Sequence, residues 1–278
     1  MIRYVCFLCL SVVLGKLSAQ VSATPKDRAL FHAKMTSIAK QHKQAGPQSI
    51  TDIAKTFQGT PYVAGSLEVG EKETLVVNLR GFDCTTYVEN VLAFYHLYCN
   101  DLQGYTDFEK ALGEIRYRHG KVAGYASRLH YFTDWIYHNA KKGLLKDITA
   151  TLGGEVLPKT LNFMGTHRNL YPALTDANNY KQITAIEESL AQRELCVIPQ
   201  EAIPQIEDRL KSGDIIALAT SIEGLDVTHT GFAIRLNNGR IHLLHASTSG
   251  TVTITEAPLE TYLKTIKHNI GIVVARPL

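Results

Sequence analysis

The sequence predicts an α+β fold in which helices pack on one face of an antiparallel sheet. Helical spacing of apolar residues dominates the first part of the chain, and short runs rich in Ile, Val, Leu and Ala dominate the part after about residue 210. The connections between these late runs are short, which favours antiparallel pairing. Helices followed by a meander of strands are typical of domains whose helices lie together on one side of the sheet.

The helices can be placed from apolar spacing and capping residues. The stretch between residues 148 and 179 is rich in Gly, Pro, Thr and Asn instead, which predicts a long irregular excursion of the kind that often forms a lid or a binding wall. Helical patterns run over residues 27–43, a short stretch capped by Ser49, residues 107–118, 127–142 and 184–193, and a short stretch after Pro204.

The strands follow in the last part of the chain. Asn237-Asn238-Gly239 is a strong hairpin turn signal between two of them. A helix over residues 258–266 precedes the last strand. Strands are expected at residues 215–219, 228–235, 241–247, 251–255 and 270–275.

Length and composition describe an ordinary globular protein. The 278 residues are 45% hydrophobic and 20% charged, which suits a single domain over residues 24–278. The formal charge of +3 comes without any Lys/Arg run, so no nucleic-acid binding is expected. No protein partner is evident, and no segment after the N-terminus is long and apolar enough to span a membrane.

Residues 1–23 have the pattern of a secretory signal peptide. Arg3 precedes an apolar run from Tyr4 to Gly15, and small residues allow cleavage after Ala19 or Ala23. We therefore expect an exported protein, either periplasmic or secreted.

Removal of this segment leaves three cysteines, namely Cys84, Cys99 and Cys196. In an oxidising compartment an odd number leaves at least one thiol free or paired between molecules. Cys84 is the free one if Cys99 and Cys196 form a disulfide, but three free cysteines agree equally well with the sequence.

Cys84 opens a helical pattern in the stretch Gly81-Phe82-Asp83-Cys84. Val88, Val91 and Leu92 continue one apolar stripe from it, so the sulfur should point inward from a helix N-terminus, where the macrodipole favours a thiolate. A lone cysteine is more commonly a small buried apolar residue. A nucleophile therefore needs a second signal elsewhere in the chain.

That second signal is a pair of histidines on the predicted hairpin. His229 shares a strand face with Gly231 and Ala233, so a helix could approach this face closely, and His245 can lie on the same surface while His242 points away. A thiol nucleophile needs a base, and the base works better when a third group orients it. Cys84, His229 and His245 can take these three roles.

These segments resemble the NlpC-type cell-wall cysteine amidohydrolases, a papain-like superfamily. The resemblance rests on Phe82-Asp83-Cys84, on the strands that begin at His229 and His245, and on Gly59-Thr60-Pro61-Tyr62 with Gly65. It implies a papain-like core, Cys84, His229 and His245 as catalytic residues, and a peptidoglycan or muropeptide substrate. No cofactor is implied.

The segment between Cys84 and His229 is much longer than in minimal members of that superfamily. We expect a mostly helical insertion at about residues 100–200, and its stretch from Arg128 to Ile136 resembles an N-acetylmuramoyl-L-alanine amidase-like branch. That resemblance implies cleavage of the amide bond between N-acetylmuramic acid and L-alanine. Within the insertion, Arg128 is a candidate for contact with the substrate.

Two further residues next to Cys84 have candidate roles. The hydroxyl of Tyr62 could add an oxyanion donor to the backbone N–H of Cys84. Asp83 could hold the substrate or could cap the helix, and the sequence does not decide between these roles.

Three other functions remain open from sequence. One is an endopeptidase that cuts between D-glutamate and the diamino acid of the same stem peptide, and another is an exported wall-binding module without activity. A zinc amidase is less compatible, because His242 and His245 face opposite ways and no His/Glu ligand set is evident.

Overall fold

The computed structural model describes residues 21–46 and 48–278. The predicted signal segment lies almost wholly outside these residues, so its cleavage remains a prediction. The first helices, α1 (Pro25–Ala45) and α2 (Ile50–Lys55), begin at capping boxes formed by Thr24 with Asp27 and by Ser49 with Asp52. Both helices were expected from the sequence, and each cap satisfies backbone N–H groups that the first helical turn leaves unpaired.

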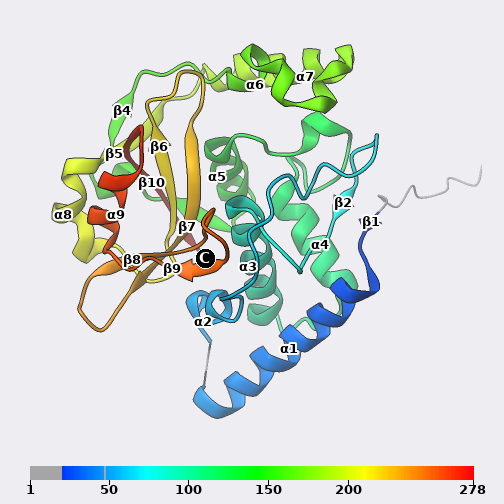
Figure 1. Cartoon of the computed structure of the whole chain (residues 1–278), viewed down its shortest axis with the longest axis vertical. Coiled ribbons are helices and arrows are strands. Elements are labelled where there is room, and N and C mark those ends of the chain that lie inside the picture. The colour runs from blue at the N-terminus through cyan, green and yellow to red at the C-terminus, as the bar shows by residue number, and fades with distance from the viewer. Residues whose placement is uncertain (1–20, 47) are drawn as a thin grey trace, which may run out of the picture.

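The helix that Cys84 opens, α3 (Cys84–Cys99), is the central element of the helical layer. Apolar side chains along it, including Val88, Val91 and Phe94, are fully buried. They pack with α1, α4 (Tyr105–Arg116) and α5 (Phe132–Lys141) into the larger hydrophobic core of the molecule. In Figure 1 these helices stand beside the sheet, with α1 along the lower edge of the molecule.

An eight-stranded sheet forms the second layer, in the order β4-β5-β10-β6-β7-β8-β9 with β3 paired to β10. Every pairing within it is antiparallel, as the sequence predicts. A separate parallel pair joins β1 (Val21–Ser22) to β2 (Leu75–Val76). The strands of the main sheet are β3 (Leu145–Asp147), β4 (Glu155–Leu157), β5 (Leu195–Pro199), β6 (Ile215–Thr220), β7 (Val227–Arg235), β8 (Ile241–Ala246), β9 (Val252–Ile254) and β10 (Asn269–Pro277).

The expectation that helices cover only one face of the sheet is wrong. Alternating side chains of β6 enter two different cores: Ile215 and Ala217 face α3, whereas Ile216 and Leu218 face the other side. That second face is covered by the short helices α8 (Ile203–Ile206) and α9 (Leu259–Thr265). The sheet therefore lies between two helical layers of unequal thickness (Figure 1).

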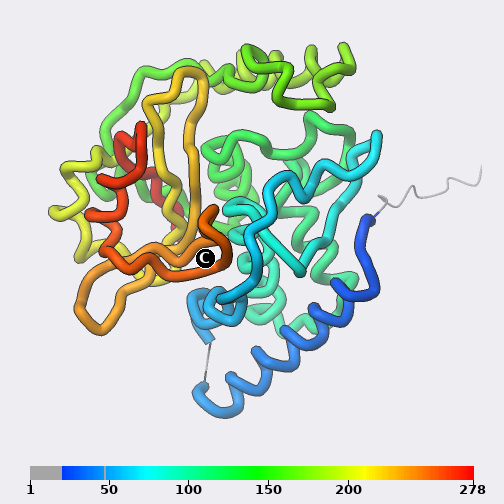
Figure 2. The backbone as a smooth tube through the Cα atoms, viewed as in Figure 1, coloured from blue at the N-terminus to red at the C-terminus, as the bar shows by residue number. Residues whose placement is uncertain are grey.

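The insertion contains strands that the sequence did not predict. It contains α4 and α5 as well as α6 (Phe163–Thr166) and α7 (Ala177–Leu190), but it also supplies β3, β4 and β5 to the main sheet. The insertion is therefore built into the domain instead of lying outside it. The backbone trace shows α6 and α7 at the end of the molecule opposite α1 (Figure 2).

Helix α5 begins at Phe132, five residues after the predicted start at 127. The preceding residues are extended, because Arg128 forms a β-bridge with Tyr117 and Leu129 donates its N–H to the carbonyl of Arg116.

In the described residues Cys84, Cys99 and Cys196 are all free, so the open disulfide pairing does not occur. No helix within the described ranges has the length and apolar character to cross a bilayer.

Candidate active site

The N-terminus of α3 carries Cys84 and is capped by Asp83. Oδ1 of Asp83 accepts from the backbone N–H of Thr86 at 2.7 Å and from its hydroxyl at 2.8 Å, and the Thr86 hydroxyl lies 3.0 Å from the backbone nitrogen of Asp83. Asp83 is therefore a helix cap, one of the two roles left open by the sequence. Its contact with substrate remains a prediction.

The loop that carries Tyr62 is fixed against the residues just before Cys84. The N–H of Phe82 donates to the carbonyl of Pro61 at 3.0 Å, and that of Val63 donates back to Phe82 at 2.9 Å. A Cβ at Gly81 would lie 2.5 Å from a methyl carbon of Val63, so only glycine allows this close approach. The glycines and Pro61 thus hold Tyr62 beside the start of α3.

The two predicted histidines meet in the structure. Nε2 of His229 on β7 lies 2.6 Å from Nδ1 of His245 on β8, and the rings are nearly perpendicular with centroids 4.8 Å apart. His242 points elsewhere, as expected, and its Nδ1 contacts the carbonyl of Thr255 at 2.8 Å. The hairpin therefore brings together the two histidines that share a face and excludes the third.

The small residues beside His229 have a different function from the one expected. A Cβ at Gly231 would lie 2.7 Å from the carbonyl oxygen of Leu244 and 2.8 Å from Cβ of His245. Gly231 thus makes room for His245, while α3 packs on the other face of β7, where Tyr87 contacts Phe232 with ring centroids 5.8 Å apart.

The sulfur of Cys84 lies where α3 meets β7. The backbone N–H groups of Thr85 and of Thr230, the residue that follows His229, lie close enough to the sulfur to lower its pKa. Its charge would raise the pKa of both Tyr62 and Tyr262, after the larger effect of burial, so both phenols lie within electrostatic reach of the sulfur. The ring of Tyr262 also packs against His245, with centroids 5.6 Å apart.

Tyr262 is the residue at this site that the sequence did not reveal. It comes from α9, on the far side of the sheet from α3. In sequence it lies within an ordinary amphipathic pattern beside Leu263, and no motif distinguishes it. Only the packing of α9 on the sheet brings its ring to His245.

The ionisable groups of the site are held neutral. Burial raises the pKa of the Cys84 thiol to about 12, Asp83 adds to this effect, and the N–H groups of Thr230 and Thr85 only partly oppose it. Burial lowers the pKa of His229 to about 3 and that of His245 to about 4. The expectation that the helix N-terminus stabilises a thiolate is therefore wrong for the free protein, because desolvation of the sulfur outweighs the dipole.

Arg128 lies apart from this group. Its Nη2 donates to Glu68 at 2.6 Å, its Nε lies 3.4 Å from Glu73, and its guanidinium stacks over the ring of Tyr125. The side chain is buried, and its partners Glu68, Glu73 and Tyr125 line another cavity. Its contact with substrate remains a prediction.

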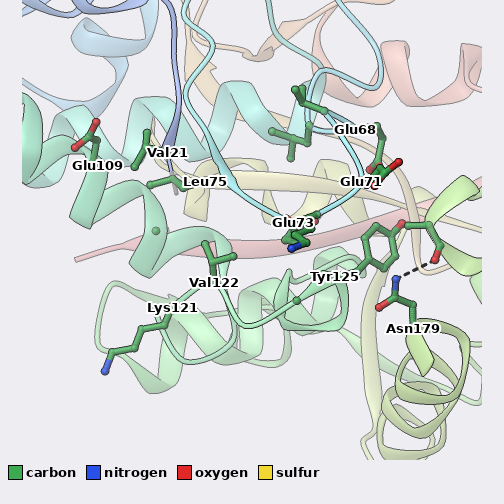
Figure 3. Close-up of a pocket in the computed structure, with 18 of the residues that line it drawn as sticks. Val21, Glu68, Glu71, Glu73, Leu75, Glu109, Lys121, Val122, Tyr125 and Asn179 are labelled. Atoms are coloured by element: carbon green, nitrogen blue, oxygen red, sulfur yellow. Dashed lines mark hydrogen bonds between the residues drawn. The ribbon is translucent and has the colours of Figure 1, made fainter. Parts of the chain in front are cut away.

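That cavity has a volume of about 1000 Å³. Figure 3 shows Glu73 near its centre, with Tyr125 and Asn179 towards one end and Val21, Leu75 and Glu109 towards the other. None of Cys84, Tyr62, His229, His245 or Tyr262 lines it. Across the described ranges no three His, Cys, Asp or Glu side chains converge as a metal site.

A thiol at a helix N-terminus, with two contacting imidazoles on an antiparallel sheet, is an arrangement typical of hydrolases that act on amide bonds. The chain belongs to the AmiA-like family, described as N-acetylmuramoyl-L-alanine amidase-like, whose model matches residues 52–272. The family places it among amidase-like proteins that act on peptidoglycan. None of the curated proteins matches the chain.

Solved structures support this membership. An N-acetylmuramoyl-L-alanine amidase from Bacteroides uniformis shares 35% identity and a TM-score of 0.77, covering 82% of this chain and 98% of its own. A Bacteroides fragilis protein described as a candidate xylanase shares 41% identity and a TM-score of 0.74 over 80% of this chain and 98% of its own. A Legionella pneumophila protein at 24% identity and a TM-score of 0.63 covers 91% of this chain and 97% of its own, and it shows the fold alone.

Proposed function

We propose that this chain is an exported cysteine amidohydrolase of the NlpC-type, papain-like superfamily that cleaves the bond between N-acetylmuramic acid and L-alanine in peptidoglycan fragments. The observation that carries the proposal is the 2.6 Å contact of His229 with His245, next to Thr230, whose backbone N–H lowers the pKa of the Cys84 thiol. A wall-binding module would have no use for a thiol at a helix N-terminus together with two uncharged imidazoles in contact. Family membership supplies the class of substrate.

The ring orientation assigns a task to each nitrogen of His229. Because Nε2 faces Nδ1 of His245, the nitrogen left for the thiol is Nδ1. In the productive tautomer Nε2 carries the proton and donates it to Nδ1 of His245, which leaves Nδ1 of His229 free to accept. His245 then stabilises the imidazolium that forms on His229, as the third member of a nucleophile–base–orienter set does.

The reaction starts from neutral groups. The Cys84 thiol transfers its proton to His229 as the sulfur attacks the amide carbonyl, which avoids a free thiolate in the desolvated site. The C–N bond breaks, the departing amine takes the proton from His229, and a thioester remains on Cys84. A water molecule, deprotonated by His229, attacks the thioester and releases the carboxylic acid and the thiol.

The oxyanion that forms in each step needs hydrogen-bond donors. The backbone N–H of Cys84 lies in the first turn of α3, where amides have no partner within the helix. The hydroxyl of Tyr62, from the loop fixed to Phe82, is the second donor. Asp83 holds the first turn in position as its cap.

The xylanase description of one relative implies different chemistry. Sugar hydrolysis generally uses two carboxyl groups on either side of the bond, one as acid and one as base or nucleophile. Among the described residues, the carboxylate whose charge raises the pKa of Cys84 is that of Asp83. This carboxylate caps helix α3. The site thus favours amide hydrolysis, as in the Bacteroides uniformis relative.

The test is product analysis on defined muropeptides by mass spectrometry. Release of a free sugar and a peptide that begins with L-alanine is expected, and Cys84→Ala should abolish it. Cys99→Ala, which removes an exposed thiol, is the matched control and should retain activity. A sugar that keeps a dipeptide would identify the endopeptidase instead, and unchanged substrate with the folded wild-type protein would contradict the proposal.

A further inference from the structure

A second cavity, of about 660 Å³, lies at the C-terminal ends of α4 and α5. It shares no residue with the site around Cys84. Four cationic side chains face it against one carboxylate, and two histidines complete the wall. This basic pocket is lined by Lys110, Glu114, Arg118, His119, Gly120, His138, Lys141 and Lys142.

Cations at helix C-termini often serve only to cap free carbonyls and to balance the helix dipole. Here the carbonyls have other donors. Among the described side chains that line the pocket, only Lys142 caps such carbonyls. Its Nζ donates to the carbonyls of Glu114 and Tyr117. Five further carbonyls near the ends of the two helices accept from the side chain of Asn139 and from the N–H groups of Leu129, Lys142, Leu144 and Gly143, namely those of Ile115, Arg116, His138, Asn139 and Ala140.

Arg118 is held rigidly at the back of the basic pocket. Its Nη1 lies 2.7 Å from Nε2 of His138 and its Nη2 lies 2.7 Å from Oδ2 of Asp134. The same carboxylate also lies 2.7 Å from Nη1 of Arg193. One buried carboxylate therefore balances two guanidiniums, and positive charge remains on this side of the molecule.

The remaining cations are also incompletely neutralised. Nζ of Lys141 lies over the ring of Tyr137 at 4.4 Å, and Nζ of Lys110 lies 3.6 Å from Asp107. Burial lowers the pKa of His138 to about 4, and Arg118 contributes to the lowering although Asp134 opposes it. Besides burial, the charges of Arg118, Arg193 and Lys142 act against a positive charge on His138.

We propose that the basic pocket binds the phosphate group of an anionic ligand. The guanidinium of Arg118, held by His138 and Asp134, and the exposed side chains of Lys110 and Lys141 line one cavity, and such groups recognise phosphate. The phosphate can belong to a small soluble compound or to a lipid headgroup at a membrane surface. The proposal does not depend on the reaction at Cys84.

Titration calorimetry at low salt with inorganic phosphate tests the shared chemistry. The variant is Lys110→Gln/Lys141→Gln, which changes two side chains without buried hydrogen bonds. The control, Lys40→Gln/Lys267→Gln, removes the same charge from two exposed positions outside the pocket. We expect the pocket variant to bind phosphate about tenfold or more weakly, since hydrogen bonds to charged groups contribute strongly. Equal affinities of the two variants, or no saturable binding by the wild type, would overturn the proposal.

Vesicles distinguish the two sources of phosphate. Sedimentation with phosphatidylglycerol vesicles, compared with phosphatidylcholine vesicles, should capture the wild type but not the pocket variant if the ligand is a lipid headgroup. If free phosphate binds and neither vesicle captures the protein, the ligand is a soluble phosphate compound. Both results support a phosphate site, whereas capture of the wild type and the pocket variant to the same extent contradicts it.

Discussion

Two buried pairs of titratable side chains lie beside α3, and the protein holds them in opposite ways. Glu89 of α3 and Arg116 of α4 form an ion pair at 2.7 Å with both side chains 2% exposed, and Arg116 also donates to the carbonyl of Val76. His229 and His245 contact each other as closely, yet within the described residues no carboxylate pairs with either ring. One pair is charged and balanced, and the other is neutral.

The difference separates groups that hold the fold from groups that can exchange protons. In the Glu89–Arg116 pair each charge compensates the other, so removing one partner strands a buried charge. In the histidine pair burial lowers both pKa values, and His245 adds to the lowering at His229, so the rings stay neutral bases at neutral pH. In the proposed mechanism a buried neutral imidazole accepts the proton of the Cys84 thiol, which a balanced ion pair could not do.

The largest expected effect comes from removing the base. His229→Gln keeps the size of the side chain but supplies no basic nitrogen, and we expect kcat on a muropeptide to fall about 10³-fold, within the usual range for loss of a general base. The free energy of unfolding should change little, because no charge is stranded. Initial rates and urea unfolding of the same samples measure both quantities. A variant that kept more than a tenth of wild-type activity would remove His229 from the mechanism.

The ion pair should respond in the reverse manner. Glu89→Gln leaves the Arg116 charge buried without its partner, and a loss of about 3–5 kcal/mol in the free energy of unfolding is expected. The double variant Glu89→Leu/Arg116→Met removes both charges and should recover much of that loss. Urea unfolding curves for the single and double variants give the measurement. If Glu89→Gln were as stable as the wild type, the pair would not be structural.

The local parts of the site could be predicted from the sequence because local chemistry specifies them. Asp83 and Cys84 mark a helix start, Asn238-Gly239 marks the hairpin, and strand alternation alone separates His242 from His245. The expectation that a helix packs closely against Gly231 was wrong. Strand alternation predicts the face on which Gly231 lies, but it does not predict which neighbouring element packs there. Across the sheet it is β8, and not α3, that uses the space.

The insertion shows why the rest of the fold could not be predicted. Its strands β3 and β4 have three residues each, too few for a visible period, and they exist because β10 and β5 pair with them. The direction of the pKa shift of Cys84 likewise depends on residues that are distant in sequence. A helix N-terminus is visible in sequence, but the burial that outweighs it comes from the packing of distant elements around Cys84.

A smaller effect is expected from the ring that supports the histidine pair. Tyr262 packs against His245, so Tyr262→Leu should let that ring move and lower kcat about tenfold with little change in KM. Tyr262→Phe keeps the ring and should restore most of the rate. Steady-state kinetics of both variants decide this. Equal rates for the Leu variant and the wild type would show that His245 needs no support from α9.

The smallest effect is a dependence of stability on pH. The pKa of His245 is lowered from 6.5 to about 4 in the folded protein. Between these values the unfolded chain binds a proton that the folded chain does not, so stability is lost as the pH falls from 7 to 5. In His245→Gln this loss should be smaller by about 1–2 kcal/mol. Urea unfolding at both pH values tests it, with His268→Gln as an exposed control. An equal loss in the wild type and His245→Gln would mean that His245 is charged in the folded state, and the contrast with the Glu89–Arg116 pair would then no longer hold.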